Sequence, residues 1–191
     1  MGLDINIETN NSKELYLADY YDKKNDYLNK HSLSRRFCDF MCRKDVVSHE
    51  PELDQIGRIT GVDISPIYEM ETYPNEEELE FFLEVADSEE EKQKILKKAE
   101  EDKAKLQANI DKVLKTVIEL IKKLNAIDNL PALLLPTDFD SLGNKEYFSD
   151  FQIDKGKGCV ENNFGQDLRN FERFLEFVKN RGTKTVWFNY G

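Results

Sequence analysis

The two ends of the chain carry the alternating pattern that is typical of β-strands. Leu3, Ile5 and Ile7 alternate with polar residues near the N-terminus, which predicts a strand with one buried face. The closing segment TVWFNYG, residues 185–191, has apolar or aromatic side chains on both faces, with Trp187 opposite its neighbours. Because a strand covered on both faces usually lies inside a sheet, we expect this strand to be central.

Between these strands, apolar positions three and four residues apart predict helices over residues 33–44 and 167–179. A further short helix is expected to begin at Pro51, since proline suits a first helical position. Residues 62–74 have no helical period and indicate extended chain. The segment EYFSDFQID, residues 146–154, alternates and predicts a third strand.

The centre of the chain carries the longest helical pattern. Ser88 followed by Glu91 forms a capping box, and a helix is expected from there to about Leu124. Residues 106–124 have a wide apolar face, which favours burial inside the protein over a two-stranded coiled coil. The first half is mostly charged, so we expect it either to protrude or to pack as a hairpin against the preceding helix.

Together these patterns predict an α+β fold in a single domain, residues 1–191. A small sheet is expected from the N-terminal and C-terminal strands and residues 145–155, with helices packed on it. One long central helix, about residues 88–124, belongs to a helical segment, residues 75–124, that can project as a hairpin. A chain of 191 residues that is 39% hydrophobic has enough apolar material for one core.

Charge is distributed unevenly along the chain. The net charge is −11, which disfavours nonspecific binding to nucleic acid because lysine and arginine must neutralise phosphates there. Residues 45–91 contain sixteen acids and one base, Arg58, so this window carries −15 and the rest of the chain +4. Such a window can steer a partner protein with a basic surface, although a solvated acidic face would also keep the protein soluble. The candidate contact residues are the acids of the helix before Ser88: Glu76, Glu77, Glu78, Glu80 and Glu84.

Both histidines and two of the three cysteines lie close together in the sequence. Cys38 and Cys42 are one helical turn apart and could chelate a metal ion. His31 and His49 would each lie roughly 10 Å along the helix axis from the nearer cysteine, in opposite directions. The alternative is a buried helix whose apolar face includes both cysteines. We expect no cofactor and keep the metal site as the alternative.

A second metal-like motif is DFDSLGN, residues 138–144, which resembles the start of a calcium loop. Leu142 replaces the third ligand, and Ser149 stands where the bidentate glutamate belongs. A proline-bounded turn explains the segment better.

Three sequence features bear on the compartment. No run of 18 apolar residues occurs, so we expect no membrane span. The first residues lack the basic start and apolar stretch of a signal peptide. Three cysteines without the spacing of a disulfide framework favour a reducing, cytoplasmic setting.

Three short motifs resemble a loose group of small bacterial and phage proteins. These are the start MGLDINI, the segment LLPT at residues 134–137 after a long helix, and the aromatic end TVWFNYG. The early helix LSRRFCDFMCRK departs from that group because it lacks a tryptophan. The resemblance implies an accessory protein associated with a phage or another mobile element, and it carries no activity or site residue with it.

These observations favour a non-enzymatic interaction or accessory module in the cytoplasm that uses the acidic surface and the long helix. One alternative is a small metal-binding protein or metal-dependent enzyme centred on the cysteines and histidines. Another is an acidic mimic of DNA, which would need its acids in rows at phosphate-like spacing. A homodimer through residues 106–124 is a further possibility, ranked lower because that face is so wide.

Overall fold

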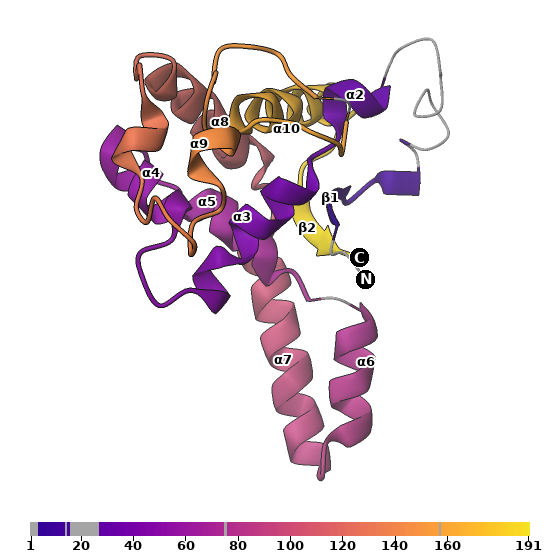
Figure 1. Cartoon of the computed structure of the whole chain (residues 1–191). Coiled ribbons are helices and arrows are strands. Elements are labelled where there is room, and N and C mark those ends of the chain that lie inside the picture. The colour runs from indigo at the N-terminus through magenta and orange to yellow at the C-terminus, as the bar shows by residue number, and fades with distance from the viewer. Residues whose placement is uncertain (1–3, 14, 16–26, 75, 157) are drawn as a thin grey trace.

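The computed structural model describes residues 4–13, 15, 27–74, 76–156 and 158–191, with the backbone alone for residues 27, 28 and 76–78. This part of the chain is mostly helical and contains one two-stranded sheet (Figure 1). In chain order the elements are β1 (Ile5–Thr9), α2 (Tyr27–His31), α3 (Arg35–Val46), α4 (Glu52–Thr60), α5 (Ser65–Glu69), η2 (Met70–Thr72), α6 (Glu76–Val85), α7 (Glu89–Leu106), α8 (Ile110–Leu124), η3 (Leu130–Leu133), α9 (Asn144–Tyr147), α10 (Phe164–Lys179) and β2 (Val186–Tyr190). The predicted α+β class is confirmed.

The sheet joins the two ends of the chain, as predicted. β1 and β2 are antiparallel, with Ile5 opposite Tyr190 and Thr9 opposite Val186. The prediction of a central strand is wrong, because β2 pairs only with β1 within the described residues. Helical segments cover β2 instead of neighbouring strands: Phe188 is buried in the core, and Trp187 stacks on Tyr73 with ring centroids 4.0 Å apart.

Two further predictions of extended chain are wrong. The segment predicted as a third strand, residues 146–154, contains the end of α9 followed by turns. Its aromatic residues favour strands in isolation, but Tyr147, Phe148 and Phe151 are all buried, which an alternating strand with one exposed face does not allow. Residues 62–74 contain α5 and η2, where Pro66 occupies the first turn of α5.

The core lies between α3, α8, α10 and the sheet. α8 packs against α10 and α5. Aromatic rings fill the space between α3, α10 and β2, with Phe40 5.0 Å from Phe164 and Phe171 5.6 Å from Phe188 between ring centroids. The apolar face of α8 is used inside the chain, so dimerisation through residues 106–124 would compete with this core.

The predicted single helix over residues 88–124 is wrong in one respect, because it is two helices. α7 and α8 are separated at residues 107–109, where Ala108 has φ 58°. The side chain of Asn109 pairs with the start of β2 like a neighbouring strand. Its Oδ1 accepts from the backbone N–H of Val186 at 2.9 Å, and its Nδ2 donates to the Val186 carbonyl at 2.8 Å. These contacts turn the chain out of the helix.

α6 and α7 form an antiparallel hairpin that projects from the rest of the molecule (Figure 1). The predicted capping box starts α7: Ser88 Oγ accepts from the N–H of Glu91 at 3.2 Å, and Glu91 Oε2 accepts from the N–H of Asp87 at 3.0 Å. These two hydrogen bonds satisfy two backbone donors at the turn, where the chain reverses between the two helices.

Candidate functional site

The hairpin carries the residues that sequence analysis proposed for partner contact. The side chains of Glu80 and Glu84 are exposed on α6. Glu76, Glu77 and Glu78 lie in the first turn of the same helix, but their side chains are outside the described residues. The structure thus places two of the five predicted acids on the surface and leaves the other three untested.

The same helix exposes large apolar side chains, which sequence analysis did not single out as a site. Phe81 is 59% exposed, Phe82 52% and Val85 55%, and the two phenylalanine rings contact each other with centroids 5.9 Å apart. Leu79 and Leu83, one turn apart on another face, are less exposed. At 100° per residue Phe81 and Val85 lie roughly opposite these leucines. α6 therefore packs with its leucine face and turns an aromatic face to solvent.

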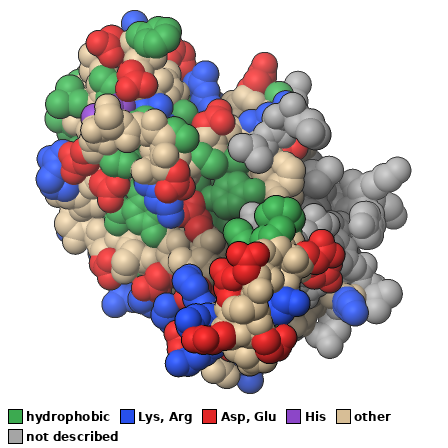
Figure 2. All heavy atoms as spheres, turned by 90° about the horizontal axis from the view of Figure 1, so that it is seen from below, with side chains coloured by type: hydrophobic (Ala, Val, Ile, Leu, Met, Phe, Trp, Pro, Cys, Tyr) green, Lys and Arg blue, Asp and Glu red, His purple; other side chains and the backbone are tan. Residues whose placement is uncertain are grey.

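The charges of α7 differ from those of α6. Acids and lysines of α7 form ion pairs along its length: Glu90–Lys94, Lys97–Glu101, Lys98–Asp102, Glu100–Lys103 and Asp102–Lys105. Seen from the projecting end, acidic and basic side chains are mixed (Figure 2). Because bases interrupt the acids of α7, the described surface gives no support to a row of carboxylates that imitates DNA.

The acids of residues 45–91 are also partly neutralised by neighbouring bases. Several pair with bases on other elements: Glu52 with Arg43, Glu69 with Lys112, and Glu71 with Lys44. The strong asymmetry along the sequence is therefore partly cancelled in space. Two described α-helices of this window contain acids and no lysine or arginine, α5 and α6. The one acid of α5, Glu69, is already paired with Lys112.

The two cysteines of the predicted metal site lie on α3 and face the core. Cys38 is fully buried and Cys42 partly buried. Burial raises the pKa of the Cys38 thiol to about 12 and also raises the pKa of Cys42. A metal ion binds the thiolate, and these environments disfavour it. The buried-helix interpretation agrees with these positions.

The two histidines lie at separate places. His31 ends α2 and packs against Phe177 of α10, with ring centroids 5.1 Å apart, and burial lowers its pKa to about 4. His49 lies between α3 and α4, where Nδ1 is 3.2 Å from Asp140. Among the described residues no group of three or more histidine, cysteine, aspartate or glutamate side chains is arranged to hold a metal ion. The structure does not bring the four predicted ligands together.

A buried carboxylate that sequence analysis missed connects α3 to α10. Asp167 Oδ1 accepts from the Ser34 N–H at 2.9 Å and from Asn162 Nδ2 at 2.8 Å. Its Oδ2 accepts from Ser34 Oγ at 2.6 Å and from the Tyr147 hydroxyl at 2.7 Å. Burial raises the pKa of Asp167 to about 6, and the four hydrogen bonds oppose that rise.

This network joins the N-terminal ends of two helices. Ser34 caps α3, and Asp167 stands in the first turn of α10, so one negative charge faces two positive helix ends. We interpret the network as a structural element, because all four lone-pair positions of the carboxylate are already used by the protein.

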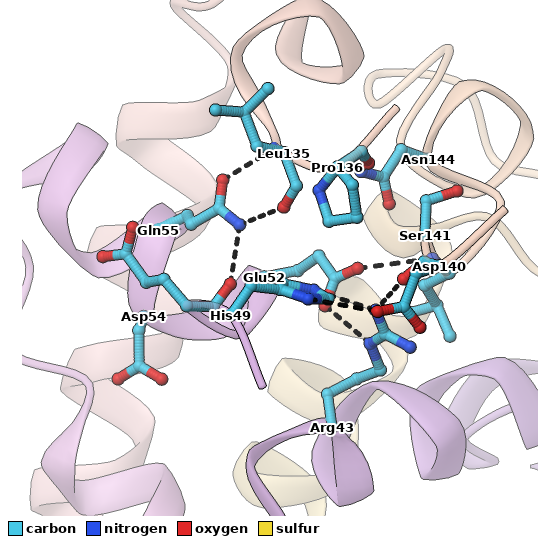
Figure 3. Close-up of polar contacts among 12 residues, drawn as sticks. Arg43, His49, Glu52, Asp54, Gln55, Leu135, Pro136, Asp140, Ser141 and Asn144 are labelled. Atoms are coloured by element: carbon cyan, nitrogen blue, oxygen red, sulfur yellow. Dashed lines mark hydrogen bonds and ion pairs between the residues drawn. The ribbon is translucent and has the colours of Figure 1, made fainter. Parts of the chain in front are cut away.

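A second polar cluster fixes the loop over residues 135–142 (Figure 3). Buried Glu52 accepts from Arg43 Nε at 2.9 Å and from the N–H of Leu142 at 3.3 Å. Arg43 also donates to the carbonyl of Asp140 and lies 3.2 Å from His49 Nε2. The His49 ring thus lies between the guanidinium of Arg43 and the carboxylate of Asp140, with one ring nitrogen toward each.

Gln55 holds the other end of this loop. It is 2% exposed, its Oε1 accepts from the N–H of Leu135 at 2.8 Å, and its Nε2 donates to the carbonyls of Leu135 and Glu50. Asn144 Nδ2 donates to the carbonyl of Pro136 at 2.9 Å. The loop backbone is thus fixed by side chains from α3, α4 and α9.

Neither cluster could be found from the sequence by spacing, because each is joined by contacts between distant segments: Gln55 and Leu135 are 80 positions apart, and Ser34 and Asp167 are 133 apart. The one local signal was the segment LLPT with the following DFDSLGN, which marked this loop as unusual without indicating what holds it.

Comparison with known proteins found no matching family model, no similar curated protein and no similar solved structure. A separate search of the described helices found none with the length and apolar character needed to cross a membrane.

Proposed function

We propose that the protein is a non-enzymatic interaction module that binds a partner protein through the outer face of α6. The observation that carries this proposal is the pair Phe81 and Phe82, both more than half exposed on a projecting helix. The partner offers a basic surface around an apolar pocket.

The exposed aromatic face favours binding over a merely solvated surface. Single exposed apolar residues are normal, but clustered ones on a projecting element are typical of interaction sites. Phenylalanine side chains have only two rotatable bonds, so an interface that buries them loses little side-chain entropy. Phe81, Phe82 and Val85 supply such a cluster.

Charge indicates the character of the partner. Glu80 and Glu84 flank the aromatic face, and α6 contains no lysine or arginine. A negatively charged rim accelerates association with a positively charged surface, and this acceleration weakens as the salt concentration rises. We therefore expect basic residues on the partner opposite this rim.

We place this role in the cytoplasm. Cys38, Cys42 and Cys159 are all unpaired, and free thiols persist in a reducing compartment.

The test is capture of a partner from the cells that encode the protein. Immobilised full-length protein is compared with Phe81→Ser/Phe82→Ser and with Glu80→Gln/Glu84→Gln, and bound proteins are identified by mass spectrometry. The serine variant is expected to retain at most about a tenth of the captured partner, since buried aromatic anchors dominate interface energies. The glutamine variant is expected to weaken capture more at low salt than at high salt.

Matched substitutions elsewhere serve as controls. Ile153→Ser removes a comparably exposed apolar side chain, and Asp128→Asn/Glu176→Gln removes two exposed charges. Both controls should capture the same partner as the wild type. Equal capture by the hairpin variants and the controls would refute the proposal.

A further inference from the structure

The surface around the loop over residues 135–142 has the features of a second binding site, separate from the hairpin. Figure 1 shows this loop beside α4 and α9 on the body, away from the projecting ends of α6 and α7. Side chains from three helices fix its backbone, as Figure 3 shows. We call this surface the 135–142 surface.

Apolar side chains of this fixed loop point into solvent. Leu135 is 65% exposed and Phe139 is fully exposed. The carbonyl and N–H of Leu135 both form hydrogen bonds with Gln55, and these bonds fix the direction in which the Leu135 side chain leaves the backbone. A loop that is rigid and still displays apolar groups loses little conformational entropy when a partner covers it.

A cavity of about 490 Å³ lies beside these side chains, which is within the size range of binding pockets. Leu135 and Pro136 form part of its wall, and Glu50, Asp138 and Asp140 also line it. No lysine or arginine is among the described residues that line this cavity. The larger cavity beside Ser34, of about 810 Å³, has three bases and three acids in its lining, so its charge favours no particular ligand.

The charges around the smaller cavity leave a net negative site. Arg58 pairs with Glu50 at 2.7 Å and holds the pKa of that carboxyl below its usual range. Beneath the loop, Arg43 pairs with Glu52, and the two charged atoms are 2.9 Å apart. Asp138 forms no ion pair with any described residue, and Oδ2 of Asp140 lies 3.2 Å from His49 Nδ1. The carboxylate of Asp138 and Oδ1 of Asp140 are therefore available to an incoming cation.

We propose that the 135–142 surface binds a peptide segment of a partner protein, with an arginine side chain in the cavity and an apolar neighbour against Leu135 and Phe139. Arginine fits because its planar guanidinium has five donors for carboxylate oxygens and carries an apolar stem. The cavity supplies the carboxylates Asp138 and Asp140, and the exposed loop side chains supply the apolar contact.

The test uses full-length ¹⁵N-labelled protein and two synthetic peptides. Acetyl-Leu-Arg-Leu-amide is titrated to about 10 mM, and the same peptide with citrulline, the neutral analogue of arginine, is the control. The arginine peptide is expected to shift amide resonances of residues 49–55 and 133–142 and to bind at least about tenfold more tightly than the control, since charged hydrogen bonds are the stronger ones.

Two variants test the contacts. Asp138→Asn is expected to lower the affinity for the arginine peptide and to leave the affinity for the citrulline peptide unchanged. Phe139→Ser is expected to lower the affinity for both peptides by about three- to tenfold. Both side chains are exposed, so each variant should retain the wild-type amide spectrum outside the loop. Phe81→Ser/Phe82→Ser should bind the peptide normally, which separates this test from that of the proposed function.

Three outcomes would overturn the inference. The first is the absence of localised shifts at the highest peptide concentration. The second is equal affinity for the arginine and citrulline peptides. The third is a shift of the same resonances on concentrating the protein alone, which would assign the surface to a second copy of the chain.

Discussion

The hairpin and the body of the molecule use helices that are equally regular but are stabilised differently. α7 has 18 residues, of which Ala99 and Leu106 are buried, whereas α8 has 15 residues, of which seven are buried. α7 therefore depends on local interactions, namely its capping box and its ion pairs between neighbouring turns. α8 depends on burial against α10 and α5. Regular secondary structure alone thus says little about where the stability of this protein lies.

The largest difference is expected from matched leucines on the two helices. Leu120 of α8 is fully buried and Leu96 of α7 is 39% exposed. Leu120→Ala should lower the free energy of unfolding by about 2–5 kcal/mol, because it removes buried contacts and leaves a cavity. Leu96→Ala should lower it by less than about 1 kcal/mol. Urea denaturation measures both, and equal losses would contradict the comparison.

The second-largest loss of stability is expected at the junction between the hairpin and the body, where Asn109 contacts β2. Asn109→Ala removes both side-chain hydrogen bonds to Val186 and leaves a buried N–H and carbonyl unpaired. The free energy of unfolding should fall by about 1–3 kcal/mol. Gln107→Ala, at an exposed position two residues away, is the control for urea denaturation. A loss no larger than that of the control would mean that Asn109 does not hold the junction.

The smallest effect concerns how the two regions respond to pH. The pKa of Asp167 in the body is raised from 3.8 to about 6, so the folded state binds its proton more tightly than the unfolded state does. This group therefore stabilises the protein relatively more at low pH, and the contribution disappears as pH rises through about 6. Relative to Asp167→Asn, the wild type should gain on the order of 1 kcal/mol between pH 7.5 and pH 5.

Asp102 of α7 should show the opposite sign. Hydrogen bonds from Lys105 and Lys98 lower its pKa below 3.8, so its contribution is present above that value and is lost as pH falls through the folded pKa. Unfolding curves of wild type, Asp167→Asn and Asp102→Asn at several pH values measure both slopes. Slopes of the same sign would contradict the assigned environments.

Local signals predicted the hairpin side of this comparison well. The capping box at Ser88 depends on two residues three positions apart, and it is present. The end of the helix at residue 107 was not predicted, because it depends on hydrogen bonds to a strand 77 positions away. The alternation of aromatic residues over 146–154 predicted a strand and was wrong for a similar reason. Packing of these rings against α3 and α10 determines the backbone conformation of the segment.

In the candidate sites too, features that depend on neighbouring residues could be predicted and features that depend on distant contacts could not. Exposure of Glu80 and Glu84 could be predicted from the charge pattern, and burial of Cys38 from the helical period of α3. The fixed loop over residues 135–142 could not, because Gln55 and Arg43 reach it from helices that are distant in sequence. A polar side chain in the sequence does not reveal whether it faces water or holds a remote backbone.

The pairing of β1 with β2 has a consequence for how the chain is made. Ile5 and Tyr190 are neighbours in the sheet, and Asp4 and Gly191 exchange backbone hydrogen bonds beyond them. β1 is synthesised before β2 and can pair with it only once residues 186–190 have left the ribosome. During synthesis the helices of the body can begin to pack while this edge of the core stays open, so the sheet is a late step of folding.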